Sequence, residues 1–157
     1  MKPVLWEDNK VLMVDQRRLP TEEVWNTYGN ADEVAQAIKD MVVRGAPAIG
    51  VSAALGLALE AVGFEGDSAG LRSRLHEKAA VLEATRPTAI NLKWALDRML
   101  RLADRLSSQG LSSMRDGLVT EAKEIHAEDI RLCKAIGDAG AALIPQGARV
   151  LTHCNAG

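Results

Sequence analysis

The chain has 157 residues, of which 47% are hydrophobic, and a formal net charge of −2. This length and composition predict one globular domain with a sizeable core and leave little room for more. The slight acidic excess argues against a nucleic-acid partner, because surfaces that bind nucleic acids normally carry a basic excess. Two cysteines without paired spacing, and a first segment without the apolar run of a signal peptide, favour a reducing compartment and a cytoplasmic location.

The N-terminal part of the chain predicts a small β element followed by a helix. Residues 6–14 place a polar turn between two apolar runs, as in a β-hairpin, and residues 24–28 fit another short strand. Asn30 and Glu33 have the spacing of a capping box at a helix start. The apolar residues that follow them share one helical face, so we expect helical structure from this point.

A central helix is predicted at residues 47–62. Pro47 stands at the first helical position, where its missing N–H costs nothing. Gly50 and Gly56 are small enough to let neighbouring elements approach the helix backbone closely. Because the apolar stretch at residues 46–59 is too short for a comfortable membrane span, we expect a buried helix and no membrane partner.

Three further helices are predicted after the central one. Apolar stripes at residues 71–82 and 92–106 indicate the first two, residues 107–110 fit a loop, and a long final helix covers residues 113–143. The side chains that we expect to be buried on the final helix are those of Leu118, Ala122, Ile125, Leu132, Ile136 and Leu143.

The end of the chain predicts a change of architecture. Residues 145–147, with the sequence PQG, terminate the final helix. Residues 149–152 have the short apolar, β-branched character of a strand in an α/β sheet. We therefore expect a helical domain at residues 1–147 and the first strand of a second domain at residues 148–157.

Residues 44–50, with the sequence RGAPAIG, combine a fixed cation, a flexible glycine and a helix start. The free N–H groups at a helix N-terminus carry partial positive charge, and Gly45 lets a ligand approach them. The guanidinium of Arg44 beside these groups would complete an anion site suited to phosphate. The alternative interpretation is a surface arginine before an ordinary turn.

Residues 85–91, with the sequence TRPTAIN, repeat this arrangement at another predicted helix start. Arg86 is the cation here, and Thr88 is a candidate N-cap. Either segment alone is a weak indication, but two arginines before two helix starts favour a shared anionic ligand. Asp129 falls in the apolar stripe of the final helix, where a buried carboxylate needs partners, and it is a candidate to orient an arginine such as Arg44 or Arg86.

Cys154 lies two residues after the predicted strand, and its pattern leaves two roles open. Most free cysteines are small buried hydrophobes, whereas a position at a strand end near Gly157 favours a reactive thiol that faces a pocket. A metal site shared with His153 is rejected, because adjacent strand residues point to opposite faces and no further cluster of ligands is present.

Other side chains that could take part in binding or catalysis are expected to have structural roles. His76 and His126 fall in predicted charged helices and are expected to be solvated or packed. Cys133 has no polar context and is expected in the core. The tryptophans are too scattered to form a base-stacking platform, so core packing is expected for Trp6, Trp25 and Trp94.

Three segments together resemble one known family. They are RGAPAIG at residues 44–50, TRPTAINL at residues 85–92 and LTHCNAG at residues 151–157, and in this order they closely resemble the methylthioribose-1-phosphate isomerases. That family shares a superfamily with the ribose-1,5-bisphosphate isomerases and the regulatory subunits of translation initiation factor 2B. The resemblance implies a mainly α fold with a small N-terminal β element. This would be the helical N-terminal domain of a two-domain α/β protein, ending in the first strand of a Rossmann-like domain.

The resemblance also implies roles for individual residues. Arg44, Gly45, Ala46 and Arg86 would contact a sugar phosphate, and Cys154 would be the active-site cysteine. No metal or organic cofactor is implied, and the expected assembly is a homodimer. The family's catalytic aspartate, a glutamine and an Asn-Lys pair have no counterpart in these 157 residues, so we expect this chain to be a fragment that is inactive alone.

The implied reaction is the isomerisation of 5-methylthioribose 1-phosphate to 5-methylthioribulose 1-phosphate in methionine salvage. The phosphate at C1 locks the sugar ring, so a general acid must protonate the ring oxygen before hydrogen moves between C2 and C1. Cys154 would either shuttle a proton through an enediol or stabilise a hydride-shift transition state. The alternatives are a ribose-1,5-bisphosphate isomerase and a non-catalytic, sugar-phosphate-sensing regulatory subunit of the initiation factor 2B type.

Overall fold

The computed structural model describes residues 2–153, which begin with a three-stranded antiparallel sheet. Its strands, in spatial order, are β1 (Val4–Glu7), β2 (Lys10–Val14) and β3 (Trp25–Tyr28). Glu7 pairs with Lys10, and the turn residues between them, Asp8 and Asn9, have φ values of 47° and 56°. Positive φ at both positions is typical of the type I′ turn that suits a hairpin. The predicted hairpin and third strand are confirmed.

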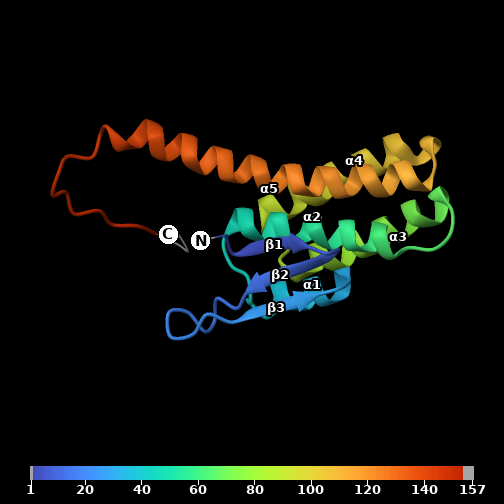
Figure 1. Ribbon diagram of the computed structural model, residues 1–157, viewed down its shortest axis with the longest axis horizontal. Coiled ribbons are helices and arrows are strands. Elements are labelled where there is room, and N and C mark those ends of the chain that lie inside the picture. The colour runs from blue at the N-terminus through green and yellow to red at the C-terminus, as the bar shows by residue number, and fades with distance from the viewer. Residues whose placement is uncertain (1, 154–157) are drawn as a thin grey trace.

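The helices form a bundle against which the sheet packs (Figure 1). They are α1 (Ala31–Lys39), α2 (Ala46–Gly63), α3 (Ser68–Thr85), α4 (Ile90–Leu106) and α5 (Leu111–Ala141), with a short 3-10 turn, η1 (Ser107–Gln109), before α5. Helix α1 begins with the predicted capping box. Asn30 Oδ1 accepts a hydrogen bond from the Glu33 N–H at 2.9 Å, and Glu33 Oε2 accepts one from the Gly29 N–H at 2.6 Å. The expected fold class, mainly α with a small N-terminal β element, is confirmed.

Helix α2 is the central element of the bundle. Its residues from Ile49 to Ala61 are all buried, and it packs against α1, α3, α4, α5 and the first two strands. A helix that is apolar on every side needs neighbours on every side. Helix α2 is long and apolar enough to cross a membrane, but 67% of it is buried inside the bundle, as is usual for a core helix.

Ion pairs fix α1 and α3 onto this core. The carboxylate of Glu60, on α2, accepts hydrogen bonds from the Ala31 N–H at 3.0 Å and from Arg74 Nε at 2.9 Å. Lys78, which is also buried, donates to Asp32 at the start of α1 at 2.6 Å. A charge that leaves water needs such partners, and every buried polar side-chain atom in the described residues has one. These contacts therefore set the positions of α1 and α3 relative to α2.

The second half of α5 projects beyond the rest of the bundle (Figure 1). With 31 residues, α5 is about 46 Å long, whereas the 17 residues of α4 extend over about 26 Å. Of the residues predicted to be buried, Leu118, Ala122 and Ile125 are buried, but Leu132, Ile136 and Leu143 are 56%, 72% and 82% exposed. Cys133, which was expected in the core, is also exposed. These four predictions are wrong because Leu132, Cys133 and Ile136 lie where α5 continues past the neighbours that would cover it, and Leu143 lies beyond the end of the helix at Ala141.

The segment after α5, residues 142–153, contains no helix or strand in the part of the chain that the structure describes. The strand predicted at residues 149–152 is therefore not formed here, and Leu151 is 96% exposed. A strand needs a neighbour to receive its N–H and C=O groups, and no described strand lies beside this segment. The division into residues 1–147 and 148–157 stays a prediction.

Replacing Leu118 and Ile136 by alanine tests the contrast between the two halves of α5. We expect Leu118→Ala to lower the free energy of unfolding by about 2–5 kcal/mol, because it empties a buried site. We expect Ile136→Ala, which removes the same number of carbon atoms from a site that is 72% exposed, to change it by less than about 0.5 kcal/mol. Urea denaturation of both variants measures the difference, and equal losses would contradict the projecting helix.

Candidate functional site

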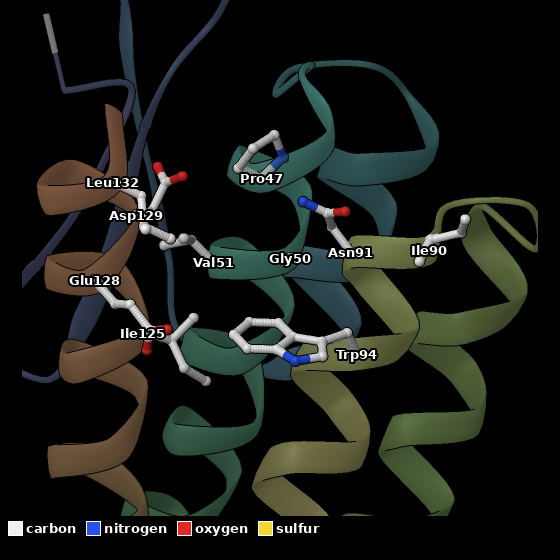
Figure 2. A pocket seen from close by; sticks show the side chains of 10 residues that line it. All are labelled: Pro47, Gly50, Val51, Ile90, Asn91, Trp94, Ile125, Glu128, Asp129 and Leu132. Atoms are coloured by element: carbon white, nitrogen blue, oxygen red, sulfur yellow. The ribbon is translucent and has the colours of Figure 1, made fainter. Parts of the chain in front are cut away.

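The starts of α2 and α4 lie side by side at one end of the bundle (Figures 1 and 2). A Cβ atom built on Gly50, in the second turn of α2, would lie only 2.7 Å from the carbonyl oxygen of Asn91, in the first turn of α4. Within the described residues, no side chain caps either helix start, at Gly45 or at Ala89. Both starts therefore keep N–H groups without intrahelical partners, and these groups attract anions.

The predicted phosphate-binding residues lie at these two starts. Gly45 is the N-cap of α2 with a φ of 101°, a value that favours glycine, and Ala46 is the first, exposed residue of the helix. Arg44 precedes them and is also exposed. Arg86 is the C-cap of α3, and its carbonyl oxygen accepts a hydrogen bond from the Ala89 N–H at 3.0 Å. The structure thus brings the two arginine segments to the same end of the bundle.

The prediction that Thr88 caps α4 is wrong. The N-cap is Ala89, and helix α4 begins one residue later, at Ile90. The hydrogen bond between Ala89 and Arg86 closes a turn that includes Thr88, so the hydroxyl lies one position too early for a capping bond. The consequence is a helix start without a side-chain cap, which leaves its N–H groups open to a ligand.

The end of strand β2 supports the loop that carries Arg44. The Gln16 N–H donates to the Val42 carbonyl oxygen at 2.9 Å. The preceding residue, Asp15, accepts hydrogen bonds from Arg17 Nε at 2.8 Å and Nη2 at 2.6 Å. These bonds from Arg17 lower the pKa of Asp15 from 3.8 to about 2, so the carboxylate stays charged at neutral pH. Sequence reasoning missed this support, because the pairing of Gln16 with Val42 is a long-range backbone contact without a sequence signal.

A pocket of about 340 Å³ opens between α2, α4 and α5, next to both helix starts (Figure 2). Its lining residues are Pro47, Gly50, Val51, Ile90, Asn91, Trp94, Ile125, Glu128, Asp129 and Leu132. The volume is within the range of pockets that hold small molecules. Most of the lining is apolar, with three polar side chains, which is the usual composition of such pockets.

Trp94 forms a wall of this pocket instead of packing in the core. Its side chain extends from α4 toward Ile125 of α5 (Figure 2), and the residue is 43% exposed, so the expected core position is wrong. The guanidinium carbon of Arg98 lies 5.3 Å from the centre of the ring, a cation–π contact. Arg98 also donates to Glu121 at 2.5 Å and to Glu128 at 2.6 Å, both on α5. Trp94 and Arg98 are four residues apart, a spacing that places them on one helix face and is the signal that sequence reasoning missed.

Asp129 lies in the same pocket lining but is not fully buried. It is half-buried, so its predicted burial in the apolar stripe is wrong, and the hydrogen bond that it accepts comes from Cys133 Sγ at 4.0 Å. The two helical histidines lie outside the pocket lining. His76 faces Asp104 at the surface, at 3.7 Å, and burial lowers the pKa of the half-buried His126. Within residues 2–153, no three His, Cys, Asp or Glu side chains gather in a group that could hold a metal ion.

Cys154, the predicted active-site residue, lies outside the residues that the structure describes, and its role stays a prediction. The neighbouring His153 is exposed. The described part of the predicted site therefore consists of the two arginine segments, and the pocket lies beside them.

The close contact between α2 and α4 can be tested at Gly50. We expect Gly50→Ala to lower the free energy of unfolding by about 1–3 kcal/mol, because its Cβ would collide with the backbone of α4. Gly137→Ala is the matched control, since nothing lies within 4 Å of a Cβ there, and we expect a gain of about 0.5–1 kcal/mol from helix propensity. Denaturant titrations compare both with the unmodified chain. A Gly50→Ala variant as stable as Gly137→Ala would contradict the contact.

Relatives of known name match nearly the whole chain. It is 53% identical over 157 residues to a methylthioribose-1-phosphate isomerase of Geobacter sulfurreducens, a match that covers 99% of this chain and 45% of the relative. It is 50% identical over 161 residues to the enzyme of the same name in Koribacter versatilis, with 100% and 45% coverage. The chain thus spans about 45% of the length of these curated relatives.

Solved structures show the same fold. The 5-methylthioribose 1-phosphate isomerase of Pyrococcus horikoshii superposes with a TM-score of 0.89 at 37% identity, covering 93% of this chain and 41% of that one. The delta subunit of translation initiation factor eIF-2B from A. fulgidus superposes with a TM-score of 0.85 at 32% identity, covering 94% and 43%. The family model of the initiation factor 2 subunits matches residues 42–157. The chain therefore belongs to the initiation factor 2 subunit family.

Proposed function

We propose that the complete gene product is a cytoplasmic isomerase that converts 5-methylthioribose 1-phosphate to 5-methylthioribulose 1-phosphate in methionine salvage and acts as a homodimer. The observation that carries this proposal is the meeting of two arginine-bearing, uncapped helix starts at one end of the bundle. The identity of 53% to a relative named for this activity supports the same substrate.

In the proposed complex, the phosphate of the sugar lies at the starts of α2 and α4. Arg44 and Arg86 neutralise its charge, and a guanidinium matches phosphate oxygens with paired donors. The backbone at Gly45 and Ala46 supplies N–H groups, which the positive φ of Gly45 leaves open to a ligand. Two cations on separate loops fix the orientation of the sugar as well as its position, which is what an isomerase needs to align the reacting carbons.

The proposed chemistry begins with ring opening. The ring oxygen takes a proton from a general acid as its bond to C1 breaks, hydrogen moves from C2 to C1, and the C2 hydroxyl loses its proton to become a carbonyl. We assign Cys154 to the reacting carbons, where its thiol either carries the proton through an enediol or stabilises a hydride shift. No metal or organic cofactor is required for these steps.

A second candidate is a non-catalytic subunit that binds a sugar phosphate as a signal. The similarity to the delta subunit of eIF-2B from A. fulgidus favours it, since that match covers nearly the same part of this chain. Both candidates use the same phosphate site. Turnover of 5-methylthioribose 1-phosphate by the purified gene product distinguishes them, because only the isomerase forms the ketose.

Alanine replacements of the two arginines test the phosphate site. In the complete gene product we expect Arg44→Ala and Arg86→Ala each to weaken binding of 5-methylthioribose 1-phosphate by about 1.5–3 kcal/mol, the range for hydrogen bonds to charged groups. Arg101→Ala is the matched control, because Arg101 is exposed on α4 but lies far from the helix start. Calorimetry measures all three, and unchanged affinity in both site variants would refute the assignment.

A serine replacement tests the role of Cys154. We expect Cys154→Ser to keep the fold and the substrate affinity while turnover falls about 100-fold or more, as expected for loss of a group that assists proton transfer. Cys133→Ser, at an exposed cysteine of α5, should leave turnover unchanged. Near-normal turnover in Cys154→Ser would favour a packing role for this cysteine.

A further inference from the structure

The pocket between α2, α4 and α5 has no part in the phosphate binding proposed above, yet residues of both arginine segments line it, Pro47 and Gly50 of one and Ile90 and Asn91 of the other. Pro47 follows Arg44 by three residues and Ile90 follows Arg86 by four, so the Cα atoms of these pairs are at most about 11 Å and about 14 Å apart. We propose that this pocket binds the methylthio end of the substrate and that Trp94 is the residue that recognises it. The inference rests on the function proposed above.

The lining of the pocket matches a small apolar group. Val51, Ile90, Ile125 and Leu132 give it aliphatic walls, and Trp94 adds an aromatic one. A methylthio group donates no hydrogen bond and accepts only weakly, so it loses little when it leaves water for such a surface. A hydroxyl at the same carbon loses its hydration there, which favours the thioether over an unmodified ribose.

The indole of Trp94 is held in place before any ligand arrives. Arg98 lies over the ring at 5.3 Å from its centre, and the guanidinium is itself fixed by carboxylates of Glu121 and Glu128 on the facing helix. An exposed aromatic side chain would otherwise sample several rotamers, and fixing it in advance removes that cost from binding. A thioether sulfur packs favourably against an aromatic ring, so the fixed indole gives the pocket a contact that an oxygen in the same place would not supply.

The two carboxylates in the lining exclude a second phosphate. Glu128 is paired with Arg98, whereas the hydrogen bond that Asp129 accepts comes from the thiol of Cys133. A phosphate at C5 would bring further negative charge against Asp129, which is a repulsive element of the kind that gives specificity. The pocket therefore favours the methylthio sugar over a ribose that is phosphorylated at both ends.

The test compares three ligands in the complete gene product. Calorimetry measures the affinities for 5-methylthioribose 1-phosphate, ribose 1-phosphate and ribose 1,5-bisphosphate in the unmodified protein, Trp94→Ala, Trp94→Phe and the control Trp25→Ala, on the far strand β3. We expect Trp94→Ala to weaken binding of the methylthio sugar about tenfold and that of ribose 1-phosphate less than twofold. Trp94→Phe should keep most of the affinity, and Trp25→Ala should keep all of it.

Each outcome supports or overturns the inference. If Trp94→Ala loses affinity equally for the methylthio sugar and for ribose 1-phosphate, the indole has only a structural role. If it loses affinity for neither sugar, the indole is not part of the binding site. An unmodified protein that binds all three sugars equally refutes the methylthio subsite but leaves the phosphate site intact. An unmodified protein that binds none of the three sugars refutes the proposed function as well. If circular dichroism shows that Trp94→Ala is unfolded, Ile90→Ser at an 82% exposed lining position replaces it, with the same selective loss expected.

Discussion

The close approach of α2 and α4 at Gly50 is the contact on which the candidate site depends. Because Gly50 has no side chain, the first turn of α4 rests directly on α2, with the Asn91 carbonyl where a Cβ would otherwise be. This contact places two uncapped helix starts side by side, so their partial positive charges add at one point. Arg44 and Arg86 reach the same end of the bundle only because the two starts are aligned in this way.

The sheet contributes to the site by supporting the loop that carries Arg44. The end of β2 holds the backbone at Val42, two residues before Arg44, through the N–H of Gln16. The neighbouring Asp15 is fixed by Arg17, whose hydrogen bonds lower the pKa of Asp15 to about 2. A flexible loop would lose entropy when it closed on a phosphate. Because the sheet already supports this loop, less entropy is lost when a phosphate binds. This is how the small β element contributes to the site.

Local signals in the sequence predicted the elements that depend on local interactions. The turn at Asp8 and Asn9 and the capping box at Asn30 formed as expected, and the central helix formed with its start at Ala46, one residue before Pro47. Errors arose where the outcome depends on distant neighbours. The spacing of Leu132 and Ile136 correctly places them on one face of α5, but periodicity does not reveal that α4 is too short to cover that face. Trp94 was expected in the core for the same reason, since its place at a rim follows only from how three helices meet.

The charges around the site give a ligand one preferred orientation. The uncapped helix starts and two arginines make one end positive, while the adjoining pocket has apolar walls and the carboxylate of Asp129, since that of Glu128 is paired with Arg98. A molecule that is anionic at one end and apolar at the other gains from both regions in one orientation and loses from both in the reverse one. The pocket also joins three helices, so a ligand that fills it would hold α5 against the α2 and α4 pair. Since α5 leaves the bundle just beyond Ile125, ligand binding there would stabilise the point from which its projecting half extends.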